Sequence, residues 1–173
     1  MFSGQLLPFF DPRKFADQGL EMKGQTSVGE LPRLADFRGA ENESVDVALQ
    51  FGRNEDGKPS VEGTVSAHLT MPCQRCLEPV TYQVTASVNL VMVWTEKQMK
   101  ALPEHQEGYM VTADEKMPLS HLLEEELLLA APLVAMHEQC PNPLVKEQAS
   151  AADDVVKADN PFAVLAKLKS QQE

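Results

Sequence analysis

The strictest pattern in the sequence is an alternation of apolar and polar residues that runs from Val80 to Trp94. Every second residue there is apolar, while threonine, glutamine, serine and asparagine fill most of the positions between. A period of two predicts a long β-strand with one buried face. Such a strand needs neighbouring strands and a layer against its apolar face, which favours an antiparallel sheet with helices on one side.

Two further segments carry the same alternation and supply neighbours for this strand. Residues 45–51 are apolar at the odd positions, and residues 61–71 continue the pattern beyond the turn cluster GRNEDGKP. Gly63 lies on the apolar face of the second segment and indicates a β-bulge. A weaker alternation at residues 20–28 predicts a short strand, and Tyr109–Val111 predicts a short edge strand.

Helical spacing is clearest in residues 119–131, which predict one long helix ended by Pro132. Four leucines define its buried face: Leu119, Leu122, Leu123 and Leu127. The run Glu124–Glu126 is expected to face largely towards solvent. Residues 31–37 predict a short helix, and residues 95–108 a loop with one helical turn. The expected fold is therefore α+β, an antiparallel β-sheet meander with helices packed on one face.

The composition divides the chain into one domain and a tail. Residues 1–145 predict a single α+β domain, because 43% hydrophobic residues is enough to fill one core. Residues 146–159 are small and charged without a period, which predicts a flexible linker. Residues 160–170 predict a short helix that ends a mobile C-terminal tail. This helix either packs on the domain or docks into a partner's groove through Phe162, Leu165 and Leu168.

Targeting segments are not expected in this chain. Its apolar start, MFSGQLLPFF, has no basic flank, and a proline interrupts the run short of a signal-peptide core. Nothing approaches the ~20 apolar residues of a membrane span. We therefore expect a cytoplasmic protein without a membrane partner.

Two pairs of metal-ligating residues share the same spacing. Cys73 and Cys76 lie in PCQRCLEP, between two predicted strands, and His137 and Cys140 lie in HEQC after the long helix. Together they match the three-cysteine, one-histidine pattern of tetrahedral zinc. A zinc ion there would be structural, clipping a hairpin tip to the chain after the helix. The same residues also fit a turn with buried thiols, or a redox-active CxxC pair that lacks the usual helix after it.

The charge of the chain limits its partners. Its 26 acidic and 15 basic side chains give a formal net charge of -11, which repels a phosphate backbone and suits a basic protein, although acidity also serves solubility alone. Among the dispersed basic residues, Arg33 and Arg75 are the candidates for specific partner contacts. The sequence contains no phosphate-binding glycine loop, HExxH or triad pattern, so we expect no enzyme.

Four motifs in order resemble the bacterial YceD family, described as large ribosomal RNA subunit accumulation proteins. They are DPRKFADQGLEMKGQTSVGELPRL, PCQRCLEPV, LLEEELLLAAPLVAMHEQC and NPFAVLAKLK, and the likeness extends from residue 11 to residue 169. The matching positions are Gly24, Leu31, Arg33 and Leu34 in the first motif, Cys73, Arg75, Cys76 and Leu77 in the second, Glu126, Leu129, Pro132, His137 and Cys140 in the third, and Asn160, Pro161, Phe162 and Leu165 in the last.

The resemblance implies a non-enzymatic ribosome-biogenesis factor that supports synthesis, processing or stability of large-subunit (23S) ribosomal RNA. It brings no catalytic residue with it. The acidity of the chain fits this role if the direct partner is a basic ribosomal protein or an assembly factor. Direct binding of precursor 23S rRNA and a redox-active CxxC protein are the alternatives.

Overall fold

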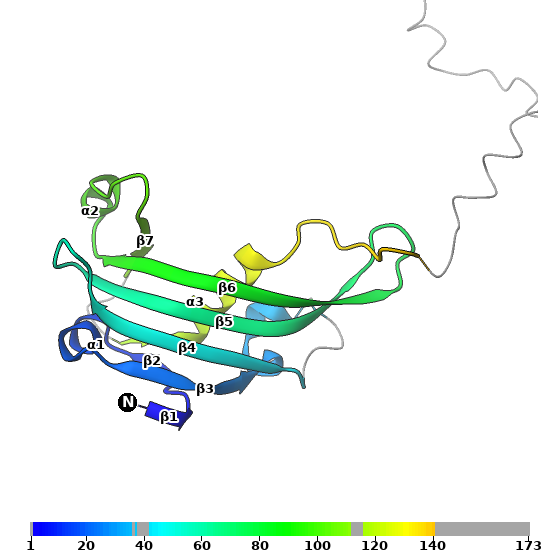
Figure 1. The fold of residues 1–173 in the computed structure, drawn as a ribbon, viewed down its shortest axis with the longest axis horizontal. Helices are drawn as coiled ribbons and strands as arrows, with labels where there is room; N and C mark the ends of the chain where they lie inside the picture. Colours follow the sequence, from blue (N-terminus) through cyan, green and yellow to red (C-terminus); the bar gives the residue numbers. More distant parts are fainter. Residues whose placement is uncertain (1, 36, 38–41, 112–115, 141–173) are drawn as a thin grey trace, which may run out of the picture. The chain divides into compact units, whose positions relative to one another are not determined.

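The computed structural model describes residues 2–35, 37, 42–111 and 116–140 (Figure 1). The chain divides into two compact units, Met1–His137 and Glu138–Glu173. The helices and strands given below all lie in the first unit. The linker predicted at 146–159 and the helix predicted at 160–170 lie outside the described residues.

Four antiparallel strands form the centre of a six-stranded sheet: β3 (Glu21–Ser27), β4 (Ser44–Arg53), β5 (Pro59–Pro72) and β6 (Pro79–Val93). This confirms the α+β fold and the predicted meander. Two short strands are added at the edges, β1 (Phe2–Gln5) parallel to β3 and β7 (Glu107–Met110) parallel to β6. The sheet is therefore mixed, because the direction of an edge strand depends on its connection and not on its alternation.

The prediction of a β-bulge at Gly63 was wrong. Gly63 pairs with Leu49 on one side and Val88 on the other, and the register is the same before and after it. A glycine is required at this position for a different reason. Its φ is +151°, and a Cβ added to it would lie 2.0 Å from the backbone oxygen of Ala48, so the backbone of β4 passes too close for any side chain.

Three α-helices accompany the sheet: α1 (Pro12–Gln18), α2 (Glu96–Lys100) and α3 (Leu119–Ala130). The first was not predicted, although its end signals are local. Asp11 accepts hydrogen bonds from the N–H groups of Arg13 and Lys14, and Gly19 ends the helix with a φ of 58°. Among the described residues, no helix is long and apolar enough to cross a membrane.

Short elements complete the described part of the chain. The helix predicted at 31–37 is replaced by two 3₁₀ turns, η1 (Val28–Glu30) and η2 (Pro32–Leu34). The strands β2 (Phe9–Phe10) and β8 (Met117–Pro118) pair antiparallel as a small second sheet. They join the start of the chain to the start of α3, where the N–H of Leu119 donates to the carbonyl of Pro8 at 2.9 Å.

The core lies on the face of the sheet that the alternation predicted. Apolar side chains of β4, β5 and β6 pack there against α1 and α3 in one continuous cluster. Phe15 of α1 contacts Phe51 of β4 edge to face, with ring centroids 5.2 Å apart. The predicted leucines of α3 are buried, with Leu122 and Leu127 fully inaccessible. The prediction that these four leucines form the buried face of the helix is therefore confirmed.

The glutamate run of α3 departs from the prediction. Glu124 is 1% exposed and Glu126 is 9% exposed, so Glu125 alone of the three faces solvent. Glu126 lies four residues after Leu122 and three after Leu123, which places it on the buried face of the helix. The expectation of a solvated run was wrong because it followed charge and ignored helical spacing.

The carboxylate of Glu124 has a structural function. Its Oε1 accepts the backbone N–H of Arg33 at 2.9 Å and so holds η2 against α3. Glu124→Ala is expected to lower the free energy of unfolding by about 1–3 kcal/mol, because that N–H loses its acceptor. Urea denaturation measures the change. The matched control is Glu125→Ala, which removes a solvent-exposed ion pair to Arg33 and should cost about 0–1 kcal/mol. Equal losses in the two variants would contradict the holding role of Glu124.

Candidate metal centre

The hairpin between β5 and β6 forms a tight loop around its two cysteines. The N–H of Cys73 donates to the carbonyl of Glu78 at 2.9 Å, and the N–H of Leu77 donates to the carbonyl of Cys73 at 2.8 Å. Leu77 has a φ of 64°, which is uncommon for a residue with a side chain. This turn closes the loop so that Cys73 and Cys76 are both buried at the hairpin tip.

The segment after α3 returns along β6 to this tip (Figure 1). The N–H of Gln74 donates to the carbonyl of Ala135 at 2.8 Å. The Tyr82 hydroxyl donates to the carbonyl of Met136 at 2.6 Å and accepts the N–H of Met136 at 2.9 Å. Hydrogen bonds from the hairpin loop and from β6 therefore place His137 beside the cysteines.

The four predicted ligands come together. The ligand atoms of Cys73, Cys76, His137 and Cys140 all lie within 4.8 Å of one another. Cys76 Sγ is 3.4 Å from Nδ1 of His137. Ligands at zinc distances of ~2.0–2.3 Å in a tetrahedron lie roughly 3.3–3.8 Å apart, so this pair is already close to zinc geometry.

The histidine ring is oriented by a second contact. Its Nε2 lies 3.1 Å from the carbonyl oxygen of Pro79, and a carbonyl only accepts, so Nε2 carries the proton. Nδ1 is then the ring nitrogen that points towards Cys76. A backbone carbonyl behind the distal nitrogen is the usual way in which proteins orient a metal-bound histidine.

Backbone donors around Cys73 favour its thiolate form. Burial raises the pKa of its thiol, but the backbone N–H groups of Cys76, Arg75 and His137, together with the His137 side chain, outweigh it and lower the pKa to about 5. The N–H of His137 lies 3.5 Å from the Cys73 sulfur. A thiolate in a ring of N–H donors is the protonation state in which cysteine binds metal.

The two arginines predicted as partner contacts are both engaged within the chain. Arg75 Nη2 donates to the carbonyl of His137 at 3.1 Å, so it braces the candidate metal centre. Arg33 Nη1 lies 3.2 Å from Glu125 of α3. Their roles towards a partner stay predictions, and the other candidates, Phe162, Leu165 and Leu168, lie outside the described residues.

Sequence reasoning missed an acidic group formed by Glu107, Glu125 and Glu126. Burial raises the pKa of Glu126, and the carboxylates of Glu107 and Glu125 raise it further. Tyr109 lies in the same group, where burial and then Glu125 raise the pKa of its phenol to about 12, opposed by Arg33. The helical position of Glu126 was the available signal, whereas the approach of β7 was not visible in the sequence.

The raised pKa of Glu126 predicts a pH dependence. In the folded protein this pKa lies above the ordinary value of 4.5. The stability that this carboxyl group contributes is therefore fully present below pH 4.5 and is lost as the pH rises through its folded-state pKa. Glu126→Gln is expected to raise the melting temperature at pH 7 while leaving it nearly unchanged at pH 4. Thermal unfolding across this range tests the sign. A variant that is less stable than the parent at pH 7 would contradict the assignment.

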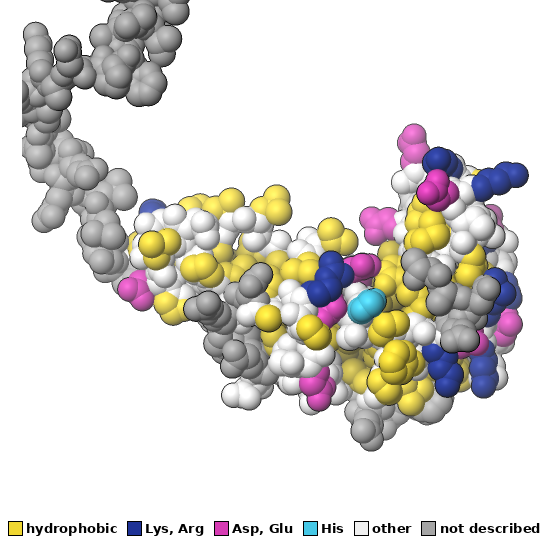
Figure 2. Space-filling model, turned by 180° about the vertical axis from the view of Figure 1, so that it is seen from behind, with side chains coloured by type: hydrophobic (Ala, Val, Ile, Leu, Met, Phe, Trp, Pro, Cys, Tyr) yellow, Lys and Arg dark blue, Asp and Glu magenta, His cyan; other side chains and the backbone are white. Residues whose placement is uncertain are grey.

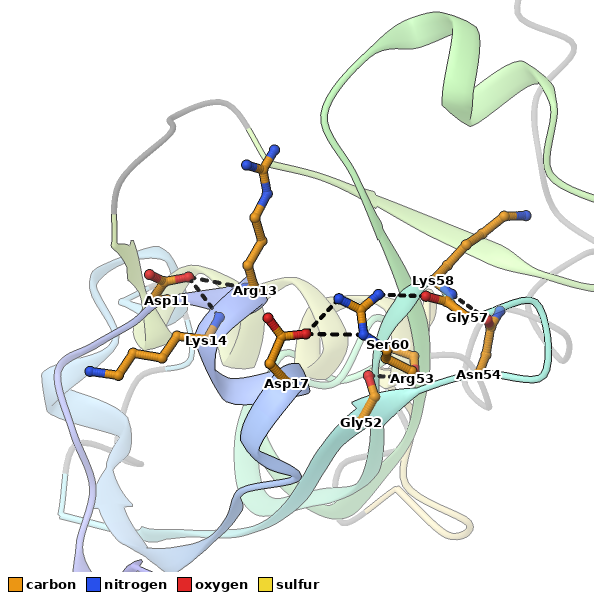
Figure 3. A network of polar contacts seen from close by, with 10 residues as sticks. All are labelled: Asp11, Arg13, Lys14, Asp17, Gly52, Arg53, Asn54, Gly57, Lys58 and Ser60. Atoms are coloured by element: carbon orange, nitrogen blue, oxygen red, sulfur yellow. Dashed lines mark hydrogen bonds and ion pairs between the residues drawn. The ribbon is translucent and has the colours of Figure 1, made fainter.

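A group of basic side chains lies around α1 and the β4–β5 turn, at the end of the sheet away from the hairpin tip (Figure 3). Carboxylates are interleaved with them. Arg53 pairs with Asp17, Lys58 lies 3.4 Å from Asp56, and Arg13 stacks over Trp94 at 4.4 Å from the ring centroid. This end of the described chain is a mixed-charge surface and not a basic stripe.

The fold and the site define a small α+β protein in which a Cys₃His ligand group joins a hairpin tip to the chain after its long helix. The profile of the family described as "Large ribosomal RNA subunit accumulation protein YceD" matches residues 61–169. A protein of that name from Haemophilus influenzae is 32% identical over 165 residues, covering 93% of this chain and 94% of that protein. No solved structure matches.

The chain belongs to the YceD family of large ribosomal RNA subunit accumulation proteins. The resemblance carried by the four motifs is therefore confirmed. The family is named for an accumulation factor and not for an enzymatic reaction.

Proposed function

We propose that this chain is a non-enzymatic ribosome-biogenesis factor that supports the accumulation of 23S rRNA by binding a basic ribosomal protein or assembly factor in the cytoplasm. Membership of the YceD family supports the proposed role in the accumulation of large-subunit rRNA. The charge of the chain supports the mode of action, because a net charge of -11 attracts a basic protein and repels RNA.

The observation that carries the choice of partner is the distribution of charge. The basic side chains around α1 and the β4–β5 turn alternate with carboxylates, so they do not form the run of unpaired cations that holds several phosphates. An acidic surface can hold a basic ribosomal protein until rRNA, a stronger polyanion, takes it over.

We further propose that the Cys₃His group holds one structural zinc ion. Four protein ligands fill a tetrahedral site and leave no position for substrate, which is typical of structural and not of catalytic zinc. The thiolate state of Cys73 and the orientation of the His137 ring both suit this role. Zinc would pin the segment after α3 to the hairpin tip.

Binding measurements on the full chain test the partner. Individually purified large-subunit ribosomal proteins of the same organism and 23S rRNA fragments are titrated separately at about 0.15 M salt. We expect micromolar or tighter binding to at least one basic protein, weakening as salt rises, and only weak binding to RNA. Tight RNA binding with no protein binding would instead support the direct binder of precursor rRNA.

The low pKa of Cys73 also favours a second candidate, a redox-active Cys73–Cys76 pair. Metal content and thiol reactivity distinguish the two. A zinc protein purifies with about one zinc per chain, and its thiols react only after chelation. A redox protein purifies without stoichiometric zinc and forms an intramolecular disulfide that thioredoxin-like reductants remove.

A further inference from the structure

Exposed apolar side chains gather at the two segments that meet at the metal centre. Within the described residues, five of the six exposed large hydrophobic side chains lie there. We call them the apolar strip: Leu77 (76% exposed), Leu129 (82%), Leu133 (103%), Val134 (56%) and Met136 (48%). Scattered apolar residues on a surface are ordinary, but a group of this kind marks an interaction site.

Contacts at the metal centre bring the two parts of the strip together. Leu77 follows Cys76 and Met136 precedes His137, and the side chains of Cys76 and His137 lie 3.4 Å apart. Figure 2 shows hydrophobic side chains gathered at this end of the domain, with few charged side chains among them. The metal centre therefore brings together the two segments that carry the strip.

The acidic group lies beside the other end of the strip. Glu125 and Glu126 precede Leu129 by one helical turn on α3. Glu126 is 9% exposed, and no hydrogen bond or ion pair joins its carboxylate to another described residue. Figure 2 shows acidic side chains beside hydrophobic ones at the middle of this face, together with a basic side chain and a histidine. Burying a carboxylate costs stability, which an incoming cation would recover.

We propose that the apolar strip and the acidic group together form the docking surface for a basic segment of a protein partner that has one apolar face. The inference rests on the proposed function and specifies the surface through which it acts. The strip supplies apolar area to bury, and Glu126 with Glu107, beside the Glu125–Arg33 ion pair, supplies a site for a lysine or arginine side chain.

Charge decides between this occupant and the others. The phosphates of RNA would meet the carboxylates of the acidic group and gain nothing from aliphatic side chains, since RNA recognition relies on cations and aromatic stacking. A second copy of this chain would bring the same negative net charge of -11. An apolar surface flanked by carboxylates fits a basic protein segment better than either.

Two sets of variants test the surface in the full-length, zinc-supplemented protein. The double variant Leu129→Ser, Leu133→Ser removes exposed apolar area from the strip. Its matched control is Phe9→Ser, because Phe9 is 52% exposed and lies outside the strip. Glu126→Gln removes the central charge, and its control is Glu62→Gln at an exposed position of β5. The probe is the large-subunit ribosomal protein that binds the parent chain most tightly among the individually purified set.

We expect the double serine variant to bind this protein about 10- to 100-fold more weakly and Glu126→Gln about 10-fold more weakly at low salt, with both controls unchanged. Melting temperatures accompany each titration. Glu126→Gln should gain stability while losing affinity, a combination that a merely structural residue does not produce. A photo-crosslinking residue at position 133 should label the ribosomal protein.

The failures are distinguishable. If the parent chain binds a ribosomal protein and both sets of variants keep full affinity, the docking surface is wrong and the proposed function stands. If crosslinks from position 133 join two copies of this chain or reach RNA, the surface has another occupant and the inference is overturned. If the parent chain binds no large-subunit protein, both the surface and the proposed function fall.

Discussion

Cys76→Ser is expected to abolish stoichiometric zinc binding and to lower the melting temperature of the zinc-loaded protein by about 10 °C. Free zinc at a thousand times its dissociation constant stabilises a folded site by about 4 kcal/mol, and each kcal/mol shifts the melting temperature of a chain of this size by about 2–4 °C. Cys76 is 7% exposed and its sulfur lies 3.4 Å from Nδ1 of His137, so it is a central member of the candidate ligand group, and serine replaces it at nearly equal volume. Metal analysis and calorimetry in zinc-buffered solution measure both effects.

The chelated parent chain is the internal control for this experiment. With zinc removed, parent and Cys76→Ser should melt within about 2 °C of each other, because the difference between them is metal binding and not packing. Gln74→Ser lies in the same loop, is exposed, and should keep full zinc content. A parent chain that carries little zinc, or whose melting temperature does not respond to a chelator, would show that these thiols pack without metal.

Gly63→Ala is expected to lower the free energy of unfolding by about 3 kcal/mol or more. The added Cβ would lie 2.0 Å from the backbone oxygen of Ala48, and the φ of +151° is strained for any residue with a side chain. Relief requires β4 and β5 to move apart at the centre of the sheet, where Leu49 and Val88 are buried on either side. Losses of this size arise from core overpacking and backbone strain.

Gly52→Ala provides the matched control on the neighbouring strand. Gly52 has no atom within 4 Å of its added Cβ and has no positive φ. Alanine there should be neutral or stabilise the protein by about 0.4–1 kcal/mol, because it lowers the conformational entropy of the unfolded chain. Chemical denaturation of both variants provides the comparison. If the two glycines respond alike, the close approach of β4 to Gly63 is not a real constraint.

Local signals accounted for much of the fold. The alternations at 45–51, 61–71 and 80–94 predicted which faces of β4, β5 and β6 are buried, because a half-buried strand imposes a period of two on its own sequence. The caps of α1 are equally local, with Asp11 before the helix and Gly19 after it. That helix could have been predicted from its end residues and was missed for want of a long apolar period.

For the candidate metal centre, too, one part was predictable from local sequence and another part was not. The paired two-residue gaps pointed to all four residues of the candidate metal centre, because residues separated by two others in a turn can face one ion. Their meeting depends on the return of the chain after α3, which hydrogen bonds from Gln74 and Tyr82 hold against the hairpin. No spacing in the sequence encodes contacts between residues about sixty positions apart.

The sequence by itself determined the class of fold, the buried strand faces, the candidate ligand set and the family, since each depends on the order of residues within short segments. Only the tertiary structure decided the parallel edge strands, the contact that buries Glu124 against Arg33, the close approach of β4 to Gly63 and the meeting of the two segments that carry the apolar strip. Each of these arises where distant segments pack together. The cost of a buried carboxylate or an added Cβ is set by whatever lies opposite it, and the neighbours along the chain do not reveal what that is.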